Sequence, residues 1–388
     1  MGIFHHDSGD GKNETCPVHS LHQDAKENIV GDFTFYQLSM IIAGACTGVT
    51  ILIMFTLKQL HATHLSNPSE QVKIMRIGTL ISMFGVISLL SISFPSAAVY
   101  IKPWLHAYEG FALGSFFLLL CDYVSPHRDQ RDVFFATKRK NGMKWFKTRW
   151  VMIFQMPVVA IITSVATDVT EAAGVFCQYS NKPRYAKIWL QVIMSLSLVA
   201  SVAAILQMYG LLKKDLAHHR PFLKLTAFKI VVGLTFIQEI IFSILSDQGV
   251  LKPTDTLTYA DVHIGIPNLL ICIEMVPLAL FFCFAYPWKV YKDGYGRGNF
   301  AKLEEAARPS SSYQGGPFGI YAWLAMLNPS DSWKAIIFAI TPNRSESPGT
   351  PVAVSNYNSD DGLISHPYNA QAYSMPPQGP RDGYSNNS

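Results

Sequence analysis

Charged residues are scarce in this chain of 388 residues, where Asp, Glu, Lys and Arg together make up only 15%. Soluble globular domains contain about 25% of these residues. Hydrophobic residues make up 49% of the sequence, and they lie in long blocks rather than at an amphipathic spacing. This distribution excludes an ordinary soluble domain and predicts an integral membrane protein, with the lipid bilayer as its partner and no nucleic acid.

The chain also lacks the sequence patterns of catalysis and of cofactor binding. It contains no phosphate-binding glycine loop, no zinc-ligand spacing and no arrangement of a nucleophile with a base. We therefore expect no enzyme, no cofactor and no metal site. Residues 1–32 contain no apolar run of the kind found in a signal peptide, so we expect the first apolar run to direct membrane insertion.

Seven apolar runs are each long enough to cross a bilayer core of about 30 Å as an α-helix. Their bounds are Phe33–Leu60, Ile74–Ile101, Trp104–Val124, Trp150–Thr170, Tyr185–Leu212, Phe222–Ser246 and Ile264–Tyr286. The sequence therefore predicts an all-α fold, in which a polytopic membrane protein forms a bundle of seven transmembrane helices.

Basic residues concentrate in alternate loops between these runs. The most basic loop joins the third and fourth runs, and its cations are Arg128, Arg131, Lys138, Arg139, Lys140, Lys144, Lys147 and Arg149. Loops rich in Lys and Arg face the cytosol. The alternation predicts an outer or lumenal N-terminus and a cytosolic C-terminus. The outer segment contains a sequon at Asn13, which can be glycosylated, and Cys16, which can form a disulfide with Cys177 on the same oxidising side.

We predict three parts in the chain, namely a polar outer segment over residues 1–32, a seven-helix domain over residues 33–291 and a cytosolic tail over residues 292–388. The tail is rich in Gly, Ser, Pro and Asn, a composition that predicts disorder over most of its length. Within it, the apolar residues of 320–340 predict a short amphipathic helix that lies on the membrane or on a partner.

Several polar side chains interrupt the apolar runs. Glu274 falls near the middle of the last run, where a charge costs about 2.5 to 3.5 kcal/mol. Lys229, at a similar depth in the sixth run, is the predicted partner, either as a structural ion pair or as part of a polar path, unless its amine reaches the inner interface instead. Glu109 and Glu239 fall toward the outer leaflet. Our hypothesis for a substrate path consists of Glu109, Lys229, Gln238, Glu239 and Glu274.

Gly44 and Gly48 in the first run form a pattern of small residues that lets two helices approach closely. We expect this pattern to serve packing within the bundle, with association with a second chain as the alternative.

Several motifs give the chain a resemblance to a known family. The stretch from His64 to Gln71, which contains Asn67 and Pro68 and is followed by Arg76, resembles the opening signature of the organic solute transporter alpha family. Further stretches that look like this family are Tyr108–Phe111, Pro221–Lys224, Phe228–Lys229, Phe236–Gln238 and Asn268–Met275. The resemblance covers residues 33–291. It implies seven membrane spans in a family of fungi, plants and animals that was formerly labelled a domain of unknown function.

The chain departs from the family pattern at Ser82, Phe84, Gly110 and Ile237, and it has only Cys121 where animal members carry a run of cysteines after the third span. The resemblance implies carrier-like movement of amphipathic organic solutes, such as steroid or bile-acid conjugates. In animals this often involves a small single-span subunit. The fungal branch is associated with the vacuolar membrane and with autophagy proteins, so both a vacuolar and a plasma-membrane location are compatible with the resemblance.

Three functions therefore compete. The first, which we favour, is a facilitative transporter. The second is a membrane scaffold whose tail recruits a ubiquitin-like autophagy modifier through Asp331, Trp333 and Ile336, an aromatic and aliphatic pair with an acidic residue upstream. Packing of Trp333 against lipid is the simpler interpretation of that motif. The third is a seven-span receptor, which the outer N-terminus favours. Against it, the third run ends in Cys121, Asp122 and Tyr123 rather than Asp-Arg-Tyr, and the seventh run lacks Asn-Pro-x-x-Tyr.

Overall fold

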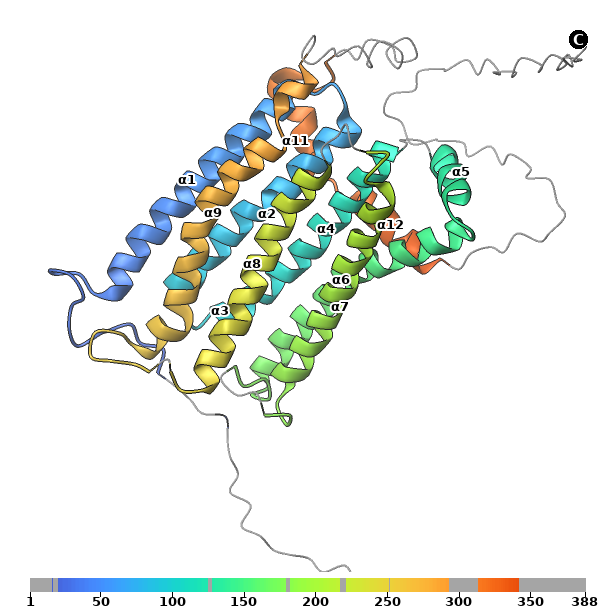
Figure 1. The fold of residues 1–388 in the computed structure, drawn as a ribbon. Coiled ribbons are helices and arrows are strands. Elements are labelled where there is room, and N and C mark those ends of the chain that lie inside the picture. The colour runs from blue at the N-terminus through green and yellow to red at the C-terminus, as the bar shows by residue number, and fades with distance from the viewer. Residues whose placement is uncertain are drawn as a thin grey trace, which may run out of the picture. The chain divides into compact units, whose positions relative to one another are not determined.

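The structure is a computed structural model that describes residue 16 and residues 20–124, 128–178, 182–216, 221–250, 252–292 and 313–341. Seven long helices of the described part run side by side as a bundle (Figure 1). They are α1 (Phe35–Thr63), α2 (Pro68–Ser93), α4 (Pro103–Val124), α6 (Gly142–Ala172), α7 (Ala186–Leu212), α8 (Pro221–Asp247) and α9 (Ile266–Ala285). Across the described residues, seven helical segments are long and apolar enough to span a membrane, as the sequence predicts.

Short helices connect or flank the long ones, and the described residues contain no strand. The connecting elements are α3 (Ala98–Ile101), α5 (Arg128–Lys138), the π-turn η2 (Asp261–Gly265), and the 3-10 turns η3 (Trp288–Tyr291) and η4 (Pro317–Gly319). Beyond η4 lie α11 (Ile320–Leu327) and α12 (Ser330–Ile340), two helices over the stretch where we expected one. Of the predicted tail, only Lys292 and residues 313–341 are described. Asn13, in the predicted outer segment, lies outside the described residues.

The helix ends follow local sequence signals. Thr34 and Gln37 form a capping box at the start of α1, in which each side chain accepts a hydrogen bond from the other's backbone amide, at 3.4 and 3.2 Å. The prediction of one helix from Ile74 to Ile101 is wrong, because α2 ends at Ser93. Pro95 lacks an amide hydrogen and disfavours helical backbone at the residue before it, so the chain breaks there and resumes as α3.

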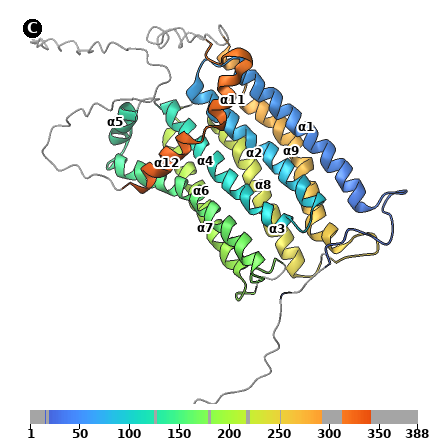
Figure 2. The same cartoon turned by 180° about the vertical axis from the view of Figure 1, so that it is seen from behind.

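The helix α4 lies at the centre of the packing, between α2 and α6 (Figure 2). Gly110 of α4 lies directly against Pro157 of α6, and a Cβ at position 110 would come within 2.8 Å of the Pro157 backbone. The departure from the family pattern at Gly110 therefore has a steric basis, since only glycine permits this approach. Aromatic rings fill the neighbouring space, with Phe117 against Trp150 and Phe154.

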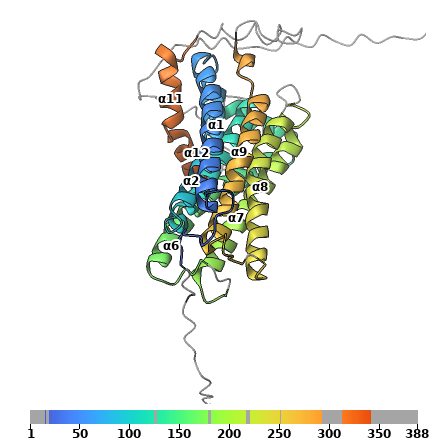
Figure 3. The same cartoon turned by 90° about the vertical axis from the view of Figure 1, so that its left-hand side faces the viewer.

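The remaining helices extend the bundle on both sides of α4. The helix α1 packs against α2 and α9, α7 packs against α6, and α8 packs chiefly against α9 (Figure 3). Gly44 and Gly48 of α1 do not serve this packing, because a Cβ at either position would meet nothing within 4 Å. The expectation that these glycines pack inside the bundle is therefore wrong for the described residues. A disulfide joins Cys16 to Cys177 in the connection between α6 and α7.

Candidate functional site

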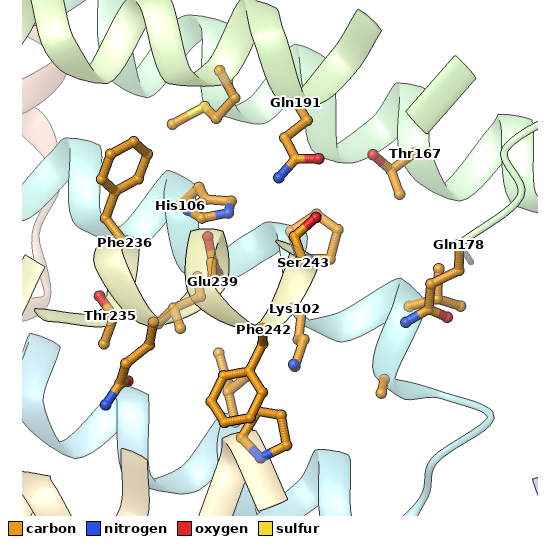
Figure 4. A pocket seen from close by; sticks show the side chains of 18 of the residues that line it. Lys102, His106, Thr167, Gln178, Gln191, Thr235, Phe236, Glu239, Phe242 and Ser243 are labelled. Carbon is orange, nitrogen blue, oxygen red and sulfur yellow. The ribbon is translucent and has the colours of Figure 1, made fainter. Parts of the chain in front are cut away.

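A cavity of about 580 Å³ opens among α4, α6, α7, α8 and α9, toward the end of the bundle where α4 begins. Figure 4 shows side chains from these helices projecting into this space. We call it the polar cavity, because charged and amide side chains interrupt its apolar wall. Its polar lining residues include Lys102, His106, Glu109, Gln191, Gln238, Glu239 and His263.

A histidine and a glutamate meet on α4, where His106 and Glu109 lie one helical turn apart. The distance from His106 Nδ1 to Glu109 Oε2 is 3.0 Å, and the side chain of Glu109 is only 5% exposed. Glu239 projects from α8 into the same part of the cavity (Figure 4), and Lys102 adds an amine at its edge. The cavity can therefore offer both cationic and anionic partners to the polar head of a bound molecule.

Gln238, the neighbour of Glu239 on α8, provides the described partner of Glu274. Its Nε2 atom lies 2.5 Å from Oε1 and 2.6 Å from Oε2 of the Glu274 carboxylate on α9. The predicted partner, Lys229, lies on α8, and its side chain is outside the described residues. The Glu274 carboxylate in the last apolar run is thus paired with the amide of Gln238. This contact joins α8 to α9 at the wall of the polar cavity.

A second cavity of about 390 Å³ lies between α7 and α8, and its wall is almost wholly apolar. We call it the apolar cavity. Leu198 and Phe236 belong to the walls of both cavities, so the polar and apolar spaces adjoin. The other residues of its wall are Leu113, Val199, Val202, Ala203, Ile205, Leu206, Leu225, Phe228, Val232 and Gly233.

The family motif between α1 and α2 has a structural role. The side chain of Gln71 is buried, and its carbonyl accepts hydrogen bonds from the amides of Ser66 and Asn67, both at 2.9 Å. Its amide nitrogen donates to the carbonyls of His61 and His64, at 3.2 and 2.9 Å. One glutamine side chain thus stabilises the turn between α1 and α2. Pro68 follows this turn as the first residue of α2, a position that proline favours.

Two further residues of the family motif, His64 and Arg76, contact segments that come much later in the sequence. His64 packs against Trp288 of η3, with ring centroids 4.6 Å apart. Arg76 donates to the main-chain carbonyls of Ala325 and Met326, in the last turn of α11, and of Asn328, directly after it, at 2.7, 3.0 and 2.7 Å. The family motif therefore anchors later parts of the chain rather than lining either cavity.

The proposed partner-binding motif of the tail is folded onto the bundle. Asp331 forms an ion pair with Arg76 at 3.2 Å, and the side chain of Ile336 is buried against the neighbouring helices. Trp333 is half exposed and its ring packs edge-on against Phe111 at 6.3 Å. In this arrangement the motif is not displayed as a free peptide.

The structure brings three of the five predicted path residues, Glu109, Gln238 and Glu239, to the polar cavity. Glu274 contacts the cavity residue Gln238 but does not belong to the cavity wall. Sequence reasoning missed Lys102 and His106. The spacing of three residues between His106 and Glu109 on one helix was the available signal for that pair.

Comparison with known proteins identifies the family to which this sequence is similar. The sequence model of the organic solute transporter Ostalpha family matches residues 39–291. The chain is 24% identical over 280 residues to Protein LAZ1 from Arabidopsis thaliana, a match that covers 64% of this chain and 58% of the relative. It is 26% identical over 254 residues to Vacuole membrane protein hfl11 from Schizosaccharomyces pombe, covering 58% of this chain and 56% of that relative.

A third relative is a Transmembrane protein 184 homolog from Dictyostelium discoideum, which is 22% identical over 272 residues, covering 65% of this chain and 53% of the relative. The match thus spans little more than half the length of these curated relatives. No solved structure matches the chain. The family match covers all seven membrane-spanning helices and extends over well beyond half of the sequence. The chain is therefore an integral membrane protein of the organic solute transporter Ostalpha family.

Proposed function

We propose that this protein is a facilitative transporter of amphipathic organic solutes, such as steroid conjugates or lipid-like molecules. The observation that carries the proposal is the junction of the polar cavity with the apolar cavity at Leu198 and Phe236. An amphipathic solute can place its charged or hydroxylated end near His106 and Glu239 while its hydrocarbon skeleton occupies the space between α7 and α8. Both volumes fall within the roughly 300–1,000 Å³ of small-molecule sites.

Contacts between the polar cavity and the end of the bundle where α4 ends support a closed passage in this conformation. Phe116 of α4 and Phe228 of α8 stack with ring centroids 5.6 Å apart. Farther along the same direction, Lys224 of α8 lies over the ring of Tyr123, at 4.4 Å, and the Tyr286 hydroxyl donates to the Lys224 carbonyl at 3.1 Å. Movement of a solute to the other side would require these contacts to separate, which makes them the proposed inner gate.

We further propose that the N-terminus faces the outside or the lumen and that the C-terminus faces the cytosol. The basic loop that contains α5 supports this orientation, and so does the disulfide between Cys16 and Cys177, because disulfides persist on the oxidising side of a membrane. Protease protection of an epitope placed after Ser388 tests the orientation. Digestion of the epitope from the outer or lumenal face of sealed membranes would contradict it.

A flux assay tests the transport function directly. The purified chain is reconstituted in proteoliposomes and challenged with a steroid sulfate, a neutral sterol and a small hydrophilic sugar. We expect passive flux of the steroid sulfate down its gradient, saturating with concentration, and no flux of the sugar. Equal permeability of protein-containing and empty liposomes to all three compounds would contradict the proposal.

A further inference from the structure

Two arginines lie over one indole ring where α6 begins. The Cζ atom of Arg139 lies 5.6 Å from the centroid of the Trp145 ring, and that of Arg149 lies 5.4 Å from the same centroid. Trp145 and Arg149 are four residues apart and therefore share one face of α6. Arg139 comes from the turn that joins α5 to α6, where Figure 1 shows α5 lying beside the start of α6.

These cations have no acidic partner within the described part of the chain. Lys138, directly before them, forms an ion pair with Asp215 at 2.7 Å, whereas Arg139, Lys140 and Arg149 form none. The Nε atom of Arg149 is buried and has no hydrogen-bond acceptor, and its Nη1 atom reaches only the sulfur of Met152, at 3.0 Å. Arg149 as a whole is half-buried, and a buried guanidinium N–H normally has an acceptor.

The start of α6 adds a further attraction for an anion. Asn141 stands at the N-cap position, but its side chain forms no hydrogen bond to the first turn of the helix. The Gly142 amide donates to the Arg139 carbonyl at 2.9 Å, whereas the next two amides of this 31-residue helix have no side-chain cap, and the helix dipole places partial positive charge at the same end. Lys144, in this first turn, is exposed and has no described ion pair.

We propose that this arginine cluster, made of Arg139, Lys140, Lys144, Trp145 and Arg149, binds the phosphate group of an anionic phospholipid. The cluster lies at the end of a membrane-spanning helix, where tryptophan rings lie at the level of lipid head groups. A guanidinium group can bind phosphate through two parallel hydrogen bonds, and its stacking on an indole restricts its orientation beforehand. Anionic lipids attract basic segments next to membrane spans. This site is separate from both cavities and does not depend on the proposed transport function.

The test measures lipid retention by native mass spectrometry of the full chain in detergent, with equal amounts of dioleoylphosphatidylserine and dioleoylphosphatidylcholine. We expect the wild type to retain phosphatidylserine preferentially. The double variant Arg139→Gln with Arg149→Gln should retain about tenfold less phosphatidylserine than the wild type. The matched control is Lys213→Gln with Lys214→Gln, which removes the same charge at the same end of the neighbouring helix α7. The control should change retention by less than about twofold.

A second variant separates binding from folding. Arg139→Lys with Arg149→Lys keeps the charge and loses the planar guanidinium, so it should fold and still weaken retention, by about threefold. Equal retention of the two lipids by the wild type would overturn the proposal, and so would equal losses in the glutamine variant and its lysine control. Displacement of the lipid by inorganic phosphate at millimolar concentration would also overturn it, because the site would then select a free anion rather than a lipid.

Discussion

The Gln238 carboxamide donates to both carboxylate oxygens of Glu274, and this contact connects α8 to α9 within the membrane-spanning bundle. A carboxylate at this depth needs a donor, since the surrounding helices offer few polar groups. Gln238 is also part of the polar cavity wall, next to Glu239. The contact therefore links the packing of two helices to the orientation of side chains in the proposed solute site.

The first prediction concerns this contact. Gln238→Ala should lower the free energy of unfolding by about 1–3 kcal/mol, because Glu274 then remains without its described donor. Glu274→Gln should cost less, since a second amide can still bond to Gln238. The measurement is thermal unfolding of the purified chain in a double-mutant cycle. Lys229→Ala provides the comparison, and strong coupling between positions 229 and 274, without coupling between 238 and 274, would favour the ion pair that the sequence predicts.

The second prediction concerns the close approach of α4 and α6. Gly110→Ala should destabilise the protein by about 1–3 kcal/mol, because the added methyl group meets the backbone of Pro157, which cannot move away as a flexible side chain would. Gly210→Ala is the matched control. It is also a helical glycine, but a Cβ there meets nothing within 4 Å, so this variant should be neutral or slightly stabilising. Equal unfolding temperatures for both variants would contradict the steric argument.

The sequence predicts the seven helices well because a helix needs a minimum length to cross the bilayer, and apolar runs of that length are easily recognised. It also identifies Glu109, Gln238 and Glu239, since strongly polar residues stand out in apolar runs. Their meeting in one cavity depends on how each helix is rotated about its axis, which sequence spacing does not determine. The same rotation decides that Gln238 faces Glu274.

Lys102 was not predicted because it lies near the end of an apolar run, where a lysine is unremarkable on membrane proteins. Only the break at Pro95 and the short helix α3 place it at the edge of the polar cavity. The attachment of α11 and α12 could not be predicted either, because nothing in the local sequence of Arg76 indicates that its partners Met326 and Asp331 lie about 250 residues away. Contacts between distant segments need the folded structure.

The third prediction concerns the charge preference of the polar cavity. Lys102→Ala should raise the KM for a steroid sulfate about fivefold and leave flux of a neutral sterol nearly unchanged, because an amine at the cavity edge attracts an anionic head group. Flux into proteoliposomes measures both. Lys252→Ala is the control, since this exposed lysine lies between α8 and η2 and does not line the cavity. An equal effect on the neutral sterol would refute the assigned role of Lys102.

The fourth prediction concerns the apolar cavity. Gly233 belongs to its wall, and a Cβ at this position meets nothing within 4 Å, so Gly233→Leu should fill the cavity without disturbing the fold. The variant should unfold at the same or a higher temperature, because leucine favours helix over glycine by roughly 0.5–1 kcal/mol. Steroid flux should fall about tenfold. Gly210→Leu, on α7 but outside the cavity wall, should leave flux unchanged, and a normal flux in Gly233→Leu would exclude this cavity from the path.

The last prediction concerns the attachment of α11 and α12 to the bundle through Arg76. Arg76→Gln removes the ion pair with Asp331 and most of the hydrogen bonds to the last turn of α11 and to Asn328. Loss of these bonds, about 1.4 kcal/mol or more, should raise protease cleavage between the two helices about tenfold. Lys334→Gln is the control, because this exposed lysine of α12 forms no described ion pair.

The same variant separates the transporter from the scaffold hypothesis. A tail that recruits a ubiquitin-like autophagy modifier must release Ile336, which is buried against the bundle. Arg76→Gln should then increase capture of the modifier by the full chain, and adding Trp333→Ala with Ile336→Ala should abolish the capture while steroid flux persists. If cleavage shows that the tail is released and the modifier still does not bind, the scaffold hypothesis fails. The exposed apolar side chains of α11 and α12 would then be assigned to contact with lipid, as the simpler interpretation of Trp333 requires.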